Sequence, residues 1–300
     1  MSVINLCKFD TVRLCCGNWQ AEIIPSIGMN TLSLTCGGRL VLRSPTSIEE
    51  LKRNPCVYGT PLLLPPNRTA GGIFSFEGRK WQLPVNEPAF NNHIHGFLHS
   101  QIFTLQDATE NSVRGIFENR GEIYPYPYRM EVICTLTEEG YRQEFVITNT
   151  GDYDMPLTFG LHTTFVAPEE IRVPIDRCWK VNSHYIPTGK LEELSEEEQL
   201  YRDGMKPEGN LVRGFYTSGG YEAEVGEFTY RVSPNFNQWV LWNGDGNSGF
   251  CAIEPLCGAV NALNSGEGLL RLKSGETVCY ATVIYQTERA AAKAPGIPAL

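Results

Sequence analysis

Short strand-like segments dominate this chain, and no helical pattern in it is long enough to connect parallel strands. Residues 130–137, 142–149 and 277–286 are rich in β-branched and aromatic side chains and are bounded by turn residues, which is typical of strands. Helical patterns are confined to residues 46–53 and to the acidic segment 195–201. A parallel strand pair needs a crossover of a dozen or more residues, usually a helix. The pattern therefore predicts an all-β chain of stacked antiparallel sheets with few short helices.

The length and continuity of the chain indicate one domain. The sequence has 300 residues, of which 42% are hydrophobic, and this is enough for a large core. It contains no internal repeat and no low-complexity linker, and its most loop-like region, residues 187–220, shows no break in composition. We therefore expect residues 1–300 to form a single domain.

Charge and cysteine content exclude several classes of protein. The net charge is −9 and there is no long basic run, so a surface that neutralises nucleic-acid phosphates is not expected. The first ten residues lack a basic segment followed by an apolar one, and no uncharged apolar stretch approaches ~20 residues, so neither export nor a membrane span is predicted. The ten cysteines are scattered without Cys-x-x-Cys spacing. This distribution fits free thiols in the reducing cytoplasm.

One strand-like segment, residues 156–165, carries a histidine on its polar face. Alternation with a period of two puts Phe159 and Leu161 on the apolar face and His162 on the opposite one. Gly160 shares the face of His162 and has no side chain. We therefore expect space for a ligand to approach the imidazole there.

A carboxylate ends another apolar strand-like run. Glu254 follows residues 249–253 and precedes Pro255, which holds the chain extended. Taken singly, His162 could be a half-buried structural histidine and Glu254 could be paired with an arginine. Together, an imidazole that titrates near neutrality and a desolvated carboxylate can move protons in both directions at pH 7. The combination favours an acid and a base that act in one site.

Two further segments carry polar candidates for a binding site. Asn67 and Arg68 lie between an apolar run and a glycine-rich turn, where an arginine offers five donors to sugar hydroxyls or a carboxylate, although a solvated surface arginine is the alternative. Residues 91–99 hold three of the five histidines. His93 and His95 have the spacing of metal ligands on a strand, but the glutamate that a cupin-type site needs does not follow, so a metal site is the weaker interpretation. At least one of the three histidines is expected to donate to a backbone carbonyl in the core.

The C-terminal half contributes an aromatic and an amide candidate. Trp239 and Trp242 fall on opposite faces of a strand-like segment, so we expect Trp239 in the core and consider Trp242 a candidate for lining a ligand site. Asn264 has an amide suited to binding a ligand, and a role in a turn is equally plausible. Residues 244–249 match Gly-x-Gly-x-x-Gly but lead into a strand-like run rather than a helix, so we interpret them as a hairpin turn.

The order of these patches resembles the aldose 1-epimerase (galactose mutarotase-like) family from about residue 37 to residue 276. No single motif is specific, but their succession is. The matching motifs are the Pro-Leu-Leu-Leu-Pro-Pro loop that reaches Arg68, Asn92-His93-Ile94-His95-Gly96, Gly160-Leu161-His162, Pro187-Thr188-Gly189, Glu254-Pro255 and Ala262-Leu263-Asn264.

The resemblance implies a β-supersandwich and a mutarotase, an isomerase that interconverts the α and β anomers of a hexose without a cofactor. It implies that His162 is the general acid, Glu254 the general base, His95 a second histidine at the ring oxygen and Arg68 a contact to sugar hydroxyls. The family pattern also has a substrate-binding Asp after the Pro-Thr-Gly turn, whereas residues 212–216 of this chain read Val-Arg-Gly-Phe-Tyr.

Four other functions fit parts of the sequence. A sugar-binding or sensing protein could use the same fold without catalysis. A hexose-6-phosphate 1-epimerase would need cations around the site, for which Arg68 and Arg213 are candidates. A glycoside hydrolase normally needs a second carboxylate beside Glu254, and a cupin-like isomerase needs a metal.

Overall fold

Antiparallel sheets make up most of the chain that the structure describes. The computed structural model describes residues 11–287. Its α-helices are short: α1 (Ile48–Arg53), α2 (Glu196–Asp203) and α3 (Ala262–Ser265). The prediction of an all-β fold with few short helices is therefore confirmed. The prediction of one domain over residues 1–300 stays a prediction, because residues 1–10 and 288–300 lie outside the described part.

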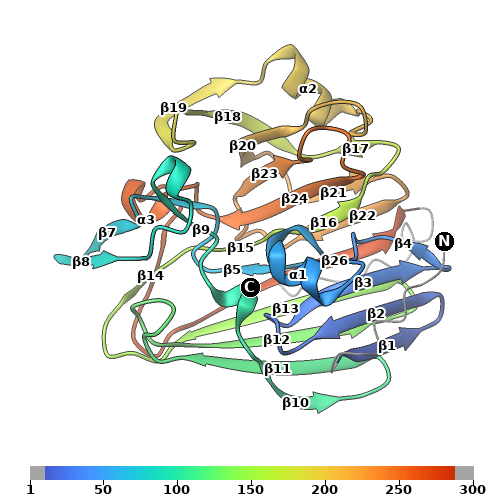
Figure 1. Cartoon of the computed structure of the whole chain (residues 1–300), viewed down its shortest axis with the longest axis horizontal. Coiled ribbons are helices and arrows are strands. Elements are labelled where there is room, and N and C mark those ends of the chain that lie inside the picture. Colours follow the sequence, from blue (N-terminus) through green and yellow to red (C-terminus); the bar gives the residue numbers. More distant parts are fainter. Residues whose placement is uncertain (1–10, 288–300) are drawn as a thin grey trace.

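The first large sheet has eight strands, and its strand order begins with four neighbours in sequence. Figure 1 shows β11 to β13 in green in the lower part of the molecule. Burial alternates along β12, so one face of this sheet is packed while the other is partly solvated, as expected for an antiparallel sheet. In spatial order its strands are β10 (Thr104–Ala108), β11 (Ser112–Asn119), β12 (Tyr128–Leu136), β13 (Gly140–Asn149), β26 (Thr277–Gln286), β22 (Phe228–Val232), β21 (Glu222–Val225) and β17 (Ile171–Arg172).

The second large sheet also has eight strands, and its central strand β24 is buried along its whole length. A strand that is buried on both faces needs other residues over each face. Over one of these faces, the covering residues can form a cleft that bears polar groups. In spatial order the strands are β19 (Pro187–Glu193), β18 (Ile175–Val181), β20 (Arg213–Ser218), β23 (Gln238–Trp242), β24 (Phe250–Cys257), β15 (Phe159–Leu161) and β5 (Leu62–Leu63), and β16 (Thr164–Val166) also pairs with β24.

Smaller sheets complete the fold. A four-stranded sheet consists of β1 (Val12–Cys16), β2 (Trp19–Ile24), β3 (Asn30–Cys36) and β4 (Arg39–Leu40). Three two-stranded sheets are formed by β6 (Arg68–Ala70) with β9 (Asn92–Ile94), β7 (Ile73–Phe76) with β8 (Arg79–Gln82), and β14 (Met155–Leu157) with β25 (Leu270–Leu272).

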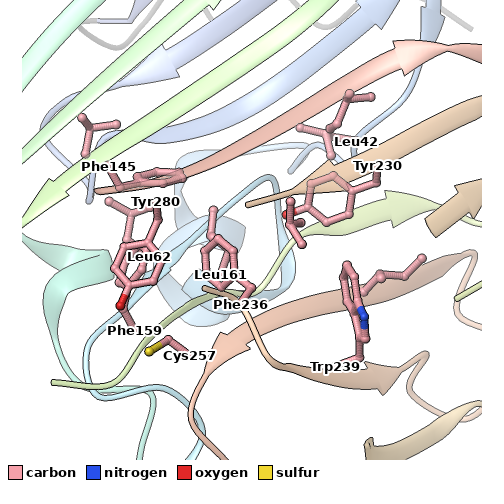
Figure 2. Close-up of a cluster of buried hydrophobic side chains, with 14 of the residues drawn as sticks. Leu42, Leu62, Phe145, Phe159, Leu161, Tyr230, Phe236, Trp239, Cys257 and Tyr280 are labelled. Atoms are coloured by element: carbon pink, nitrogen blue, oxygen red, sulfur yellow. The ribbon is translucent and has the colours of Figure 1, made fainter. Parts of the chain in front are cut away.

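Aromatic side chains from both large sheets meet in one hydrophobic core (Figure 2). The ring of Phe159 in β15 lies 5.4 Å from that of Phe145 in β13 and 5.2 Å from that of Tyr280 in β26. Tyr230 in β22 lies 6.3 Å from Trp239 in β23. The apolar face predicted for residues 156–165 thus packs against the first sheet, and His162 is left to face the other side.

Two local predictions have different outcomes. Residues 244–249 connect β23 to β24, as expected for a hairpin turn. The helix expected at residues 195–201 is present as α2. The rest of residues 187–220, the most loop-like region of the sequence, is more regular than expected, because it contains β19 and the whole of β20. Strand β19 is exposed along most of its length, so its sequence shows little of the apolar alternation that marks a buried strand.

The nine cysteines between residues 11 and 287 are free thiols. Within the same residues, none of the helices has the length and apolar character needed to cross a membrane.

Candidate active site

His162 and Glu254 face each other across two neighbouring strands. His162 lies at a short break between β15 and β16, both of which pair with β24. On either side of the break the register pairs Gly160 with Leu256 and Thr164 with Ala252. Counting inward by two residues on each strand places His162 opposite Glu254, on the same face of the sheet. The Nε2 atom of His162 lies 3.4 Å from Oε1 of Glu254, and their side chains are only 5% and 2% exposed.

The break in the strand is held in place by hydrogen bonds. The backbone N–H of His162 donates to the carbonyl of Pro61 over 3.0 Å. The carbonyl of Thr163 accepts from the N–H of Ile253 over 2.9 Å, and the hydroxyls of Thr163 and Tyr230 are 2.8 Å apart. Because these bonds anchor residues 162 and 163, the imidazole is held at a fixed position over β24.

Gly160 serves a purpose other than the predicted one. We expected its missing side chain to leave room for a ligand beside His162. Instead, the side chain of Leu256 occupies this space, and a Cβ atom at residue 160 would clash with it and lie 3.2 Å from Cβ of Pro66. The glycine allows Leu256 and Pro66 to pack closely beside the pair, so the ligand must approach the imidazole from another side.

Burial shifts the pKa values of the pair in opposite directions. Desolvation raises the pKa of the Glu254 carboxyl group to about 8, although the nearby positive charge of Arg68 opposes this rise. Desolvation lowers the pKa of His162 to about 4. Between these values the pair holds one proton, and in the free protein burial favours the state in which Glu254 is protonated and His162 is neutral. The Oε2 atom of Glu254 is buried and has no hydrogen-bond partner among the described residues, so it is available to a ligand.

His95 lies beside this pair in an unusual backbone conformation. Its φ angle is +65°, and its N–H donates to the carbonyl of Asn67 over 2.8 Å. The following residue is Gly96, at which a Cβ atom would strike the backbone of Leu64, so only glycine fits. The rings of His95 and His162 are 5.4 Å apart. Burial keeps the pKa of His95 well below its usual value, and its Nδ1 has no partner in the described residues, so a neutral imidazole with a free nitrogen faces the site.

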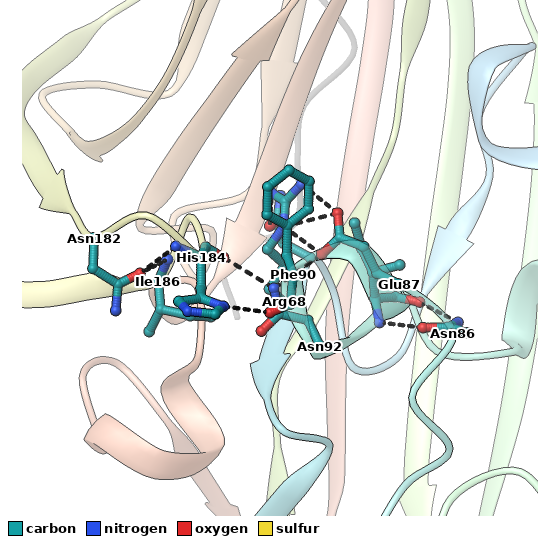
Figure 3. A network of polar contacts seen from close by, with 10 residues as sticks. Arg68, Asn86, Glu87, Phe90, Asn92, Asn182, His184 and Ile186 are labelled. Atoms are coloured by element: carbon teal, nitrogen blue, oxygen red, sulfur yellow. Dashed lines mark hydrogen bonds and ion pairs between the residues drawn. The ribbon is translucent and has the colours of Figure 1, made fainter.

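Arg68 is held in place by a carboxylate (Figure 3). Its Nε lies 2.8 Å from Oε2 of Glu87, and its Nη2 lies 2.7 Å from Oε1 of the same side chain. The side-chain amide of Asn92 donates both to Glu87 and to the carbonyl of His184, each over 2.9 Å. Nη1 of Arg68 faces the side-chain oxygen of Asn67 at 3.4 Å and forms no bond with Glu87. This side of the guanidinium remains available to a ligand.

These groups line one cleft of about 990 Å³ that aromatic side chains border. Trp242 lies 5.9 Å from the ring of His162, and Phe215 lines the same cleft. On another part of the wall, the rings of Phe90 and Tyr185 are 4.9 Å apart. A cavity of this size with apolar rings and a few convergent polar groups is the usual form of a small-molecule site.

Most of the predicted site residues meet in this cleft, and one does not. Asn67, Arg68, His95, His162, Trp242 and Glu254 all line it. Asn264 belongs to α3, does not line the cleft, and donates to the carbonyl of Ile73 over 2.9 Å. Its amide thus joins α3 to β7, which is a structural role and not a contact with a ligand.

His93 and Trp239 have structural roles in the core, as expected from the sequence. His93 is buried, and its Nδ1 donates to the carbonyl of Pro84 over 2.8 Å, as expected for one of the three clustered histidines. Trp239 is buried in the core as predicted. Residues 11–287 contain no group of three or more His, Cys, Asp or Glu side chains arranged to hold a metal ion.

Several cleft residues were not predicted from the sequence. Phe90 ends a single-turn 3-10 helix (Pro88–Phe90) and Tyr185 lies in a turn, and neither segment carries a periodic pattern. Glu87 does not line the cleft and affects it through Arg68. Arg53 lines the cleft from the end of α1. Arg213, which was named from the sequence only as a candidate cation for binding a phosphate, also lines the cleft.

Comparison with protein families and curated proteins gives a consistent result. A family model described as aldose 1-epimerase matches residues 11–285. A protein of Escherichia coli (strain K12), YihR, which is described as uncharacterized, is 27% identical over 92% of this chain and 93% of its own length. The chromosomal protein LacX of Lactococcus lactis subsp. lactis is 25% identical over 61% of this chain and 70% of its own length.

Solved structures show the same fold. A galactose mutarotase-like protein from Clostridium acetobutylicum superposes with a TM-score of 0.85, with 25% identity over 92% of this chain and 94% of the other. A galactose 1-epimerase from Lactobacillus acidophilus NCFM has a TM-score of 0.73, with 14% identity over 90% of this chain and 91% of the other. The β-supersandwich expected from the sequence motifs is confirmed.

Proposed function

This chain belongs to the aldose 1-epimerase family, and from that premise we propose that it is a mutarotase that interconverts the α and β anomers of a hexose. The observation that carries the proposal is the pair formed by His162 and Glu254, whose side-chain atoms lie 3.4 Å apart on the wall of the cleft. An imidazole and a carboxyl group at this distance can reach two neighbouring oxygens of one sugar, the C1 hydroxyl and the ring oxygen.

The reaction opens and recloses the sugar ring. The carboxylate of Glu254 removes the proton of the C1 hydroxyl while the imidazolium of His162 donates a proton to the ring oxygen. The bond between C1 and the ring oxygen breaks as C1 becomes an aldehyde carbon, so neither an alkoxide nor an oxocarbenium ion has to form alone. Rotation about the C1–C2 bond then presents the other face of the aldehyde. The reverse transfers reclose the ring and restore both groups.

The protonation state favoured by burial is that of the open-chain step. After ring opening, Glu254 carries the proton and His162 is neutral, and desolvation favours this state because it raises the pKa of Glu254 and lowers the pKa of His162. A sugar hydroxyl that donates to the carboxylate would offset the cost of the charged state in the closed-ring complex. Each positioned proton transfer is typically worth about 10²–10⁴ in rate.

The remaining cleft residues would bind and orient the ring. We propose that the neutral imidazole of His95 bonds the sugar near the ring oxygen, and that Nη1 of Arg68 with the amide of Asn67 bonds hydroxyls. Trp242 would cover an apolar face of the pyranose, since aromatic rings commonly border ligand sites.

Anomer exchange measured by NMR tests the proposal directly. We expect added protein to accelerate exchange between the α and β signals of a bound hexose, and His162→Asn or Glu254→Gln to lower the rate at least about 10²-fold. The Glu254→Gln side chain keeps its shape and still bonds a sugar. Sugar binding that persists without acceleration by the wild-type protein would instead identify a sugar-binding or sensing protein.

A further inference from the structure

Two arginines at the cleft lack the partners that other arginines have. Most arginines within residues 11–287 form ion pairs with Asp or Glu, and Arg43 and Arg79 lie over aromatic rings. Arg53 and Arg213 line the cleft, and neither forms an ion pair with a carboxylate of the described residues. Guanidinium groups that bind no protein carboxylate can bind an anionic ligand.

Strand register places Arg213 on the face that bears the acid and base pair. One row across the sheet pairs Phe215 with Val240 and Val240 with Glu254. The adjacent row on the same face, two residues along, pairs Arg213 with Trp242 and Trp242 with Ala252. Directly paired residues of antiparallel strands project to one side, so the side chains of Arg213, Trp242 and Glu254 share a face.

The spacing between Arg213 and Glu254 suits a ligand that joins them. Arg213 lies two strands away from Glu254, roughly 10 Å, and two residues along, roughly 7 Å. The Cα atoms are therefore separated by roughly 12 Å, part of which the two side chains themselves cover. Trp242 lies between them in the same row as Arg213. A pyranose whose C1 is at Glu254 and which rests against Trp242 would direct a substituent of its far side toward Arg213.

The charge balance of the cleft favours an anion. Arg53, Arg68 and Arg213 line it, and Glu254 is the one carboxylate among the described residues that does so. Burial keeps Glu254 protonated in the free protein near neutral pH, since its pKa is about 8. Arg68 is neutralised by Glu87, but Arg53 and Arg213 are not compensated in this way. A positive cleft in a chain of net charge −9 concentrates anions at the site.

We propose that the sugar substrate carries an acidic group, a carboxylate or a phosphate, on the side of the ring away from C1, and that Arg213 binds this group with Arg53 as a second cation at the rim. This proposal rests on the mutarotase function proposed above, and it concerns only which class of sugar the cleft binds. A neutral hexose would leave these two exposed guanidinium groups without an anionic partner, whereas an acidic sugar would supply one.

Matched sugars test this recognition. Calorimetric titration of the wild-type protein with glucose, glucuronate and glucose 6-phosphate should show that at least one of the anionic sugars binds about tenfold or more tightly than glucose, since a hydrogen bond to a charged group contributes about 1.5–3 kcal/mol. The preference should weaken between 50 mM and 500 mM NaCl. The two anionic sugars distinguish a carboxylate from a phosphate. Equal affinity for all three sugars would overturn the proposal.

Variants separate the anion site from the catalytic pair. Arg213→Gln should reduce the ratio of anionic to neutral sugar affinity about tenfold, and Arg53→Gln should reduce it less, while Arg120→Gln, an exposed arginine outside the cleft, should leave it unchanged. An unchanged ratio in Arg213→Gln would also overturn the proposal. Glu254→Gln should lower the rate of anomer exchange at least about 10²-fold and keep the anionic preference. If the wild-type protein prefers acidic sugars but does not accelerate their exchange, the mutarotase proposal fails and the anion site stands.

Discussion

Both carboxylate oxygens of Glu87 accept hydrogen bonds from the guanidinium of Arg68, Oε2 from Nε over 2.8 Å and Oε1 from Nη2 over 2.7 Å, and this leaves Nη1 to face the cleft. Both side chains are more than four-fifths buried, at 16% and 17% exposure. Charge-assisted, bidentate bonds in such surroundings are among the stronger ones in proteins. The position of Arg68 in the site therefore depends on a residue that itself does not line the cleft.

Glu87→Gln should weaken sugar binding by loosening Arg68. We expect a rise in KM of several-fold with a smaller change in kcat, and a loss of about 2 kcal/mol in the free energy of unfolding, because the variant removes a hydrogen-bonded charge. Urea denaturation and steady-state kinetics check the two effects. The matched control is Glu227→Gln, whose partner Arg39 is 62% exposed, and whose loss should cost less than about 1 kcal/mol. A normal KM in Glu87→Gln would show that Arg68 does not contact the sugar.

The rate of anomer exchange should follow a broad bell-shaped pH profile. The pair holds one proton between the lowered pKa of His162, about 4, and the raised pKa of Glu254, about 8. Below the first value both groups are protonated and no base remains, and above the second both are deprotonated and no acid remains. Measuring kcat/KM from pH 3.5 to 9 tests this. A profile that titrates through a single group near pH 6.5 would contradict the paired assignment.

The same shifts predict how stability depends on pH. The folded pKa of Glu254 is raised from 4.5 to about 8, so the folded state binds more protons and stability falls as pH rises through this window. The folded pKa of His162 is lowered from 6.5 to about 4, so stability rises with pH between about 4 and 6.5. The two slopes oppose each other up to about pH 6.5, and only the fall from Glu254 continues to about pH 8. In Glu254→Gln, urea denaturation at pH 6.5 and 8 should no longer show this fall, whose slope is at most about 1.4 kcal/mol per pH unit.

Much of the candidate site could be predicted from the sequence because its residues lie on strands. Period-two alternation was enough to put His162 on the face away from the core, and the structure confirms that Phe159 and Leu161 pack in the core. The pairing of β15 and β16 with β24 could not be predicted in the same way, because strand register is decided by tertiary packing between distant segments. It is this register that brings His162 within 3.4 Å of Glu254.

The loops explain most of what the sequence did not reveal. Tyr185 has a positive φ of 57° and lies over Arg68, at 5.0 Å from its guanidinium carbon, in a turn without any periodic pattern. Asn264 was considered as a ligand contact, and the unpredicted helix α3 directs its amide to Ile73 instead. Turns and a helix of a single turn such as α3 carry weak sequence signals, so side chains placed by them are found only from the structure.

Asn264→Ala should therefore change stability and leave sugar affinity as it is. Its amide donates to the carbonyl of Ile73 and to the side chain of Asn261 at 2.8 Å, so its loss should cost about 1 kcal/mol in the free energy of unfolding. Calorimetric titration with the best-bound sugar should give the wild-type Kd. A Kd raised tenfold would return Asn264 to the binding site and would require α3 to move toward the cleft.

Gly160→Ala provides a test of how closely the residues beside the pair must pack. The added Cβ atom would clash with the side chain of Leu256 and lie 3.0 Å from the carbonyl oxygen of Pro255, which directly follows Glu254. Overpacking of this kind costs about 1–3 kcal/mol, and relief of the clash would shift β24 together with its carboxyl group. We therefore expect lower stability and a fall in the exchange rate of about tenfold or more, because small misplacements of catalytic groups are costly. The control is Gly219→Ala, where a Cβ atom would have its nearest neighbour at 3.4 Å, an ordinary contact. If Gly160→Ala is destabilised but exchanges anomers at the wild-type rate, the position of Glu254 tolerates such a shift, and the close pairing with His162 is not required for the reaction.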